Sequence, residues 1–84
     1  MIEIGEEARI IYSHQLHEMR LLNLVGQRGV ISKCMLRGRT PGAFVMIEIG
    51  KNKGEEWYIP IQSIQTATDV DRLRNMAILK STKI

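Results

Sequence analysis

Hydrophobic and polar residues alternate most regularly over residues 43–49, where valine and isoleucine occupy every second position. Successive side chains of a strand point to opposite faces, so this pattern predicts a strand with one apolar face. A shorter alternating run over residues 55–59 follows the glycine-bounded segment 50–54. The two runs therefore predict a β-hairpin.

The second strand of this hairpin carries two adjacent aromatic residues, which alternation places on opposite faces. Trp57 is expected to point inward as the central core residue, and Tyr58 outward, on the same side as Phe44 of the first strand. Pro60 ends the strand because it has no backbone N–H to give to a sheet.

Turn signals divide much of the remaining chain into further short segments. Glycine and proline gather at 26–29 and 37–42, between segments rich in isoleucine and valine, which is typical of β structure. The predicted strands are 8–13, 30–36, 43–49, 55–59 and a short fifth strand at 64–67, with one turn of 3₁₀ helix at 61–64. The leucine-rich residues 14–25 are predicted either as one amphipathic turn or as an irregular loop packed on the sheet.

The C-terminal residues 69–84 carry a weaker, helical pattern. Asp69 is a favourable N-cap, and Val70, Leu73 and Ala77 fall on one stripe, which predicts a short helix. A flexible tail is the alternative, because the last residues of a domain are commonly disordered unless they are packed down. We expect a mostly β domain over residues 1–68, followed by this helix or tail.

The chain has 84 residues, of which 44% are hydrophobic and 25% are charged. We expect one domain with a modest core, because this length does not accommodate a catalytic domain together with a regulatory one. No apolar run reaches the roughly 20 residues of a membrane span, and the N-terminus is acidic where a signal peptide would be basic. Cys34 is the single cysteine and cannot form an internal disulfide. A cytoplasmic protein without membrane association is expected.

The net charge of +3 is unevenly distributed. Residues 1–26 carry four acids against two bases, and residues 55–84 balance four acids with four bases. The middle segment, 27–54, has six bases against one acid. Its net charge of +5 favours an anionic partner, although exposed basic residues at turns also keep a β domain solvated.

The order of features resembles the small SH3-like barrel family. The sequence Gly26-Gln27-Arg28-Gly29, followed by Val30 and Ile31, is similar to the glycine step of KOW-type ribosomal and transcription-factor domains and of the variable subunit of ferredoxin-thioredoxin reductase. The resemblance covers residues 5–66. It implies a small five-stranded half-open barrel and a non-catalytic binder of RNA, DNA or protein.

Residues able to support catalysis or hold a metal are few. His14 and His17 have an i, i+3 spacing that places both rings on one helical face, and Cys34 could join them. A structural zinc site needs four ligands, so we expect neither a metal site nor a cofactor. A free cysteine in a strand is usually a small buried hydrophobe. The sequence therefore predicts a protein that is not an enzyme.

The candidate contact residues are basic residues at two turns and outward aromatic residues between them, namely Arg37, Arg39, Lys51, Lys53, Phe44 and Tyr58. Cationic groups beside exposed aromatic rings suit phosphate contact and base stacking. In the alternative interpretation, Phe44 and Met46 fill a second, smaller core beneath the leucine-rich loop. The function expected first is a protein-interaction module or accessory subunit with an unidentified protein partner. The alternative is a nucleic-acid-binding module that uses the basic region 27–54.

Overall fold

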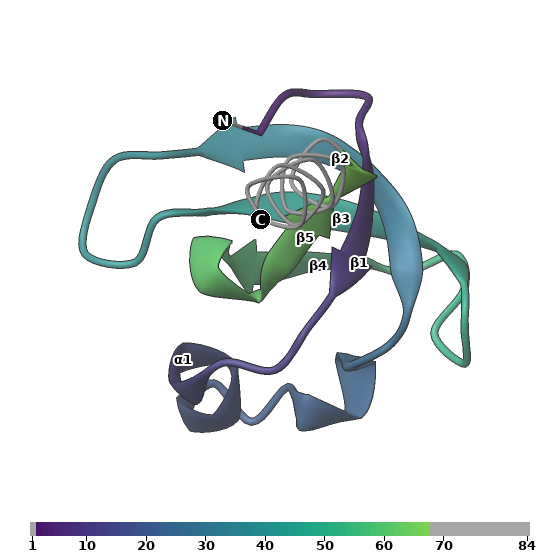
Figure 1. The fold of residues 1–84 in the computed structure, drawn as a ribbon, viewed down its shortest axis with the longest axis horizontal. Coiled ribbons are helices and arrows are strands. Elements are labelled where there is room, and N and C mark those ends of the chain that lie inside the picture. Colours follow the sequence, from purple (N-terminus) through teal and green to yellow (C-terminus); the bar gives the residue numbers. More distant parts are fainter. Residues whose placement is uncertain (1, 68–84) are drawn as a thin grey trace, which may run out of the picture.

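The computed structural model describes residues 2–67, which form one antiparallel sheet of five strands in the order β4-β3-β2-β1-β5 (Figure 1). The strands are β1 (Glu7–Ile10), β2 (Arg28–Met35), β3 (Gly42–Ile49), β4 (Glu56–Pro60) and β5 (Ile64–Thr66). Between Ile2 and Thr66 the helical elements are short: α1 (His14–Glu18) and two 3₁₀ turns, η1 (Leu22–Leu24) and η2 (Ile61–Ser63). The prediction of a mostly β fold with five strands is confirmed.

The sheet is linear, with β4 and β5 as its two edges. The long central strand β2 pairs with β1 through its first residues and with β3 along most of its length. Its register with β3 shifts between Arg28 and Gly29 and again between Ile31 and Lys33. Such bulges bend a strand and increase its twist, so β2 can take part in both halves of the sheet.

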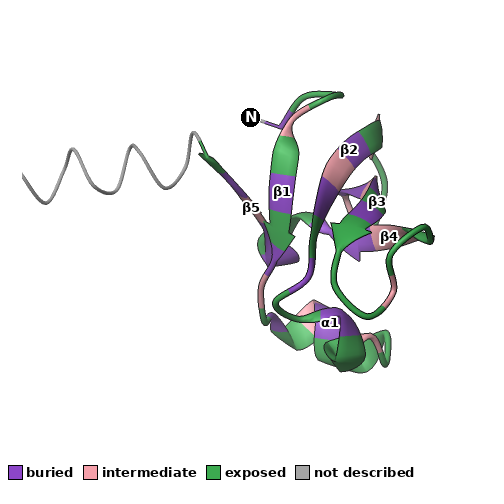
Figure 2. Cartoon of the chain, turned by 90° about the vertical axis from the view of Figure 1, so that its right-hand side faces the viewer, coloured by how far each residue is buried: buried purple, intermediate pink, exposed green. Residues whose placement is uncertain are grey.

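A single cluster of apolar side chains fills the concave side of the sheet. Every strand contributes to this cluster, and the leucine-rich segment between β1 and β2 adds Leu16 and Leu24, which are fully buried. The buried apolar residues are Ile2, Ala8, Ile10, Leu16, Leu24, Ile31, Ala43, Val45, Ile47, Ile59 and Ile64. Figure 2 shows buried and exposed residues alternating along β1, which lies between β5 and β2.

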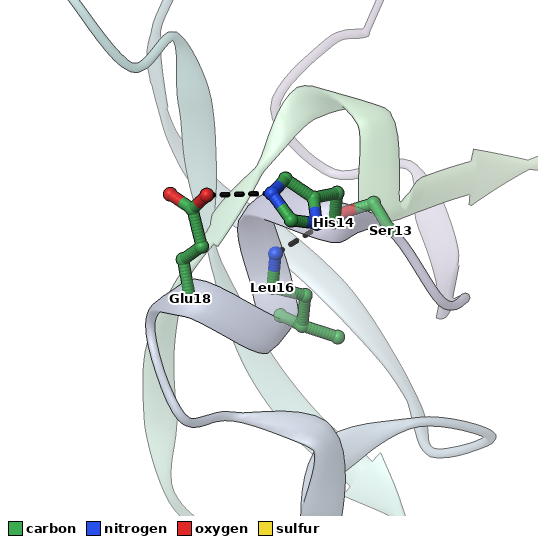
Figure 3. A network of polar contacts seen from close by, with 4 residues as sticks. All are labelled: Ser13, His14, Leu16 and Glu18. Atoms are coloured by element: carbon green, nitrogen blue, oxygen red, sulfur yellow. Dashed lines mark hydrogen bonds and ion pairs between the residues drawn. The ribbon is translucent and has the colours of Figure 1, made fainter.

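The segment 14–25 contains one turn of α-helix, as in the first predicted alternative, followed by a 3₁₀ turn that was not predicted. Ser13 caps α1: its Oγ accepts a hydrogen bond from the backbone N–H of Leu16 (3.1 Å), while His14 Nε2 lies 2.6 Å from Glu18 Oε1 (Figure 3). The Ser13 hydroxyl also hydrogen-bonds that of Ser63, which joins the start of α1 to η2.

Three predicted placements are wrong. The strand predicted over 8–13 ends at Ile10, because the backbone N–H of Ile11 donates to the carbonyl oxygen of Ser63 in η2. Tyr12, which lies beyond this end, is 62% exposed. Ile49 is 63% exposed, because it lies beyond the last residue of β3 that pairs with β4. Trp57 faces the core as predicted, but it is half-buried at the border of the core and not at its centre, since β4 is an edge strand. Its Nε1 donates to Glu55 Oε1 (2.8 Å).

The remaining element predictions agree with the structure to within a few residues. The strands predicted at 30–36, 43–49, 55–59 and 64–67 correspond to β2 to β5, and the 3₁₀ turn at 61–64 to η2. The helix or tail predicted over 69–84 lies outside the described residues. Over residues 2–67, no helix is long and apolar enough to cross a membrane.

Candidate functional site

The side of β2, β3 and β4 that faces away from the core forms one continuous surface, here called the outer face. Its central row is Lys33, Phe44 and Tyr58, which are direct neighbours across the three strands. On one side of the central row is the row of Val30, Met46 and Glu56. On its other side, Met35 of β2 lies beside Gly42 of β3. The outer face is the set Val30, Lys33, Met35, Phe44, Met46, Glu56 and Tyr58.

The aromatic pair at the centre of this face is packed edge to face. The ring centroids of Phe44 and Tyr58 are 5.2 Å apart, with an interplanar angle of 67°, a geometry that aromatic pairs favour. Both side chains are half-buried. Neither Phe44 nor Met46 belongs to the buried cluster under the leucine-rich segment, so the interpretation that they form a second core there is wrong.

Tyr58 also holds the loop between β2 and β3. Its hydroxyl donates to the carbonyl oxygen of Thr40, and Pro41 accepts a hydrogen bond from the N–H of Ile61 (2.9 Å). These two bonds fix the end of the loop against β4 and η2. The exposed residues Arg37 and Arg39 lie in this loop, which meets the sheet at Tyr58 through Thr40.

The four basic residues that the sequence analysis grouped are divided between two ends of the molecule. Arg37 and Arg39 precede β3, whereas Lys51 and Lys53 follow it in the hairpin to β4, on the opposite side of the molecule in Figure 1. The eight residues of β3 span roughly 25 Å. The loop that carries the two arginines therefore lies at the end of β3 nearer the aromatic pair, and the hairpin that carries the two lysines lies at the other end.

Sequence reasoning missed Lys33 as a member of the site. Strict alternation from the buried Ile31 would place Lys33 on the inner face. The register shift between Ile31 and Lys33 instead pairs Lys33 with Phe44 on the outer face. The bulged residue Ser32 donates its hydroxyl to Glu56 Oε2 (2.6 Å). The polar sequence Ser-Lys inside a strand was the one signal of this irregularity.

The opposite end of β3 is organised by a buried glutamine. Gln27 Nε2 donates to Asn52 Oδ1 (2.8 Å) and to the carbonyl oxygen of Asn23 (3.1 Å), and the N–H of Asn52 donates to Gln27 Oε1 (2.9 Å). A Cβ at Gly50 would lie 2.5 Å from Gln27 Cγ. The hydrogen bonds between Gln27 and Asn52 therefore hold the hairpin that carries Lys51 and Lys53 against the segment that follows η1.

We expect Gln27→Leu to lower the free energy of unfolding by about 1–3 kcal/mol, because it removes three hydrogen bonds and leaves their part-buried partners unsatisfied. Urea unfolding followed by tryptophan fluorescence measures this change. Gln62→Leu is the matched control, since Gln62 is exposed in η2 and should change stability by less than about 0.5 kcal/mol. Equal stability of both variants would show that the bridge contributes nothing.

The candidate metal ligands do not gather. His14 and His17 stack with ring centroids 6.4 Å apart in α1, whereas Cys34 lies on β2 with its Sγ 3.9 Å from the carbonyl oxygen of Ile2. Among residues 2–67, no group of three or more histidine, cysteine or acidic side chains is placed to hold a metal ion.

Comparisons with protein-family models, curated proteins and solved structures gave no match.

Proposed function

We propose that the chain is a non-catalytic protein-interaction module with an SH3-like half-open barrel, and that it binds its partner through the outer face. The barrel assignment is supported by the bent β2 shared between two halves of the sheet, by the long connection between β1 and β2, and by the 3₁₀ turn that links β4 to β5.

One observation carries the functional part of this proposal, namely the composition of the outer face. Met35 and Met46 are 42% and 37% exposed there, beside the Phe44–Tyr58 pair and next to Lys33. Interfaces are enriched in aromatic residues, methionine and arginine, with an apolar centre and a polar rim, and methionine adapts easily to a partner's shape. The matching partner surface is apolar at its centre and acidic where it meets Lys33, Arg37 and Arg39.

Substitution on the outer face tests the proposal. The immobilised chain is incubated with lysate of its source cells, and captured proteins are quantified for the wild type, Met46→Glu and the matched control Met19→Glu. Met19 is also an exposed methionine, but it lies at the end of α1. We expect a partner that the wild type and Met19→Glu retain and that Met46→Glu loses. A captured set that Met46→Glu leaves unchanged would refute binding through this face.

Nucleic-acid binding is the second candidate function, and the position of Lys33 favours it. Lys33 lies directly beside Phe44, and Arg37 and Arg39 lie in the loop at the same end of β3. Cations and aromatic rings in this arrangement suit backbone contact and base stacking. Lys51 and Lys53 lie beyond the other end of β3, too far away to contact the same short stretch of nucleic acid.

Salt dependence distinguishes this candidate. If three phosphates are neutralised, replacing Lys33, Arg37 and Arg39 by alanine should weaken oligonucleotide binding and reduce the slope of log K against log salt by about 2 for single strands. The Lys51→Ala, Lys53→Ala double variant is the control and should keep the slope. Fluorescence anisotropy with a labelled single strand measures both. Absence of binding by the wild type at about 50 mM salt would exclude this function.

A further inference from the structure

Two arginines lie side by side on a different part of the sheet. Arg9 of β1 is the direct cross-strand partner of Arg28 of β2. The same row continues to Gln65 of β5 on one side and to Ile49 of β3 on the other. Arg9 lies between the buried residues Ala8 and Ile10, so its side chain points away from the core.

This row lies in a hollow of about 320 Å³ that crosses four strands. Its lining includes the row from Gln65 to Ile49, together with Ala8 and Gly29. A volume near 300 Å³ is at the lower end of the range for small-molecule sites. The hollow is therefore large enough for a small anion with a modest group attached to it, and too small for a large cofactor.

Among the described residues, the charged groups that line the hollow form no ion pairs with one another. Glu7 and Glu48 also line it, but within residues 2–67 the one ion pair closer than 4.0 Å is that of His14 with Glu18. Like charges that face each other directly across two strands destabilise a sheet. An anion held between the two guanidinium groups would remove this repulsion and gain charge-assisted hydrogen bonds from both.

We propose that Arg9 and Arg28 bind a phosphate group, either free phosphate or the monoester of a small phosphorylated compound. One guanidinium can saturate the two oxygens of a carboxylate through its fork of N–H donors. A phosphate monoester has three terminal oxygens and carries nearly two negative charges at neutral pH, so it matches two guanidinium groups that approach from neighbouring strands. The Gln65 amide supplies a further donor at the end of the row. This site shares no residue with the outer face.

Isothermal titration of the full chain with inorganic phosphate and with adenosine monophosphate, at constant ionic strength, tests the proposal. We expect saturable binding of at least one of the two, about tenfold weaker in Arg9→Gln and in Arg28→Gln, because each loses a charge-assisted hydrogen bond. Tighter binding of the nucleotide would show that the attached group also occupies the hollow, and equal binding would indicate a site for phosphate alone.

Two control variants separate this site from general electrostatic attraction. Arg20→Gln removes the same charge from an exposed position outside the hollow and should leave the affinity within about twofold. Glu48→Gln removes an opposing charge from the hollow and should tighten binding. Binding that Arg20→Gln weakens as much as Arg28→Gln, or no saturable binding of either ligand, would overturn the proposal. Neither outcome bears on the outer face, whose test uses Met46.

Discussion

Gly29→Ala is expected to prevent the domain from folding. A Cβ at this position would overlap the carbonyl oxygen of Met46 and lie 2.9 Å from Val45 Cγ1. The obstructing atom is backbone of the central strand pair, so it cannot move aside without breaking the ladder between β2 and β3. We expect a loss of about 3 kcal/mol or more, a large part of the stability of a small domain. Circular dichroism and urea unfolding measure the loss.

Gly5→Ala is the matched control for this variant. Gly5 has a φ of +92° but open space where its Cβ would be, so alanine there costs backbone strain alone, about 1 kcal/mol. The close approach of two strands should therefore matter more than a left-handed turn. A Gly29→Ala protein that unfolds at the same urea concentration as Gly5→Ala would contradict the strand register described for β2 and β3.

Leu24→Ala is expected to cost about 2–5 kcal/mol, because Leu24 is fully buried and its truncation leaves a cavity where the 3₁₀ turn packs on the sheet. Leu22 belongs to the same turn but is 39% exposed. Leu22→Ala should therefore cost less than about 1 kcal/mol. Urea unfolding of the two variants gives the comparison directly. Similar losses for both would mean that the segment 14–25 does not pack as described.

The hairpin of β3 and β4 could be predicted from the sequence because its signals are local. Alternation over residues 43–49 fixes the faces of one strand, and the glycine-bounded segment 50–54 fixes the turn. The segment 14–25 could not be assigned, since its leucines suit a helix or a packed loop equally well until the sheet beneath them is known. The exposure of Ile49 likewise depends on where β4 stops pairing with β3.

The candidate site was predictable in its aromatic pair but not in its charges. Alternation alone places Phe44 and Tyr58 on one side of the hairpin. Grouping Arg37 and Arg39 with Lys51 and Lys53 failed because positions close in sequence lie at opposite ends of an extended strand. Lys33 and the Arg9–Arg28 pair were missed because their positions also depend on how the strands pair. A bulge moves Lys33 to the outer face, and the pairing of β1 with β2 brings Arg9 beside Arg28.

The two edges of the sheet have a consequence for self-association. An exposed edge strand offers unpaired N–H and C=O groups on which another chain can form amyloid-like contacts. Here β5 has three residues, too few to template a long strand, and β4 begins with the charged Glu56 and ends at Pro60, which cannot donate a hydrogen bond. We therefore expect the folded domain to resist aggregation through its edges even at high concentration.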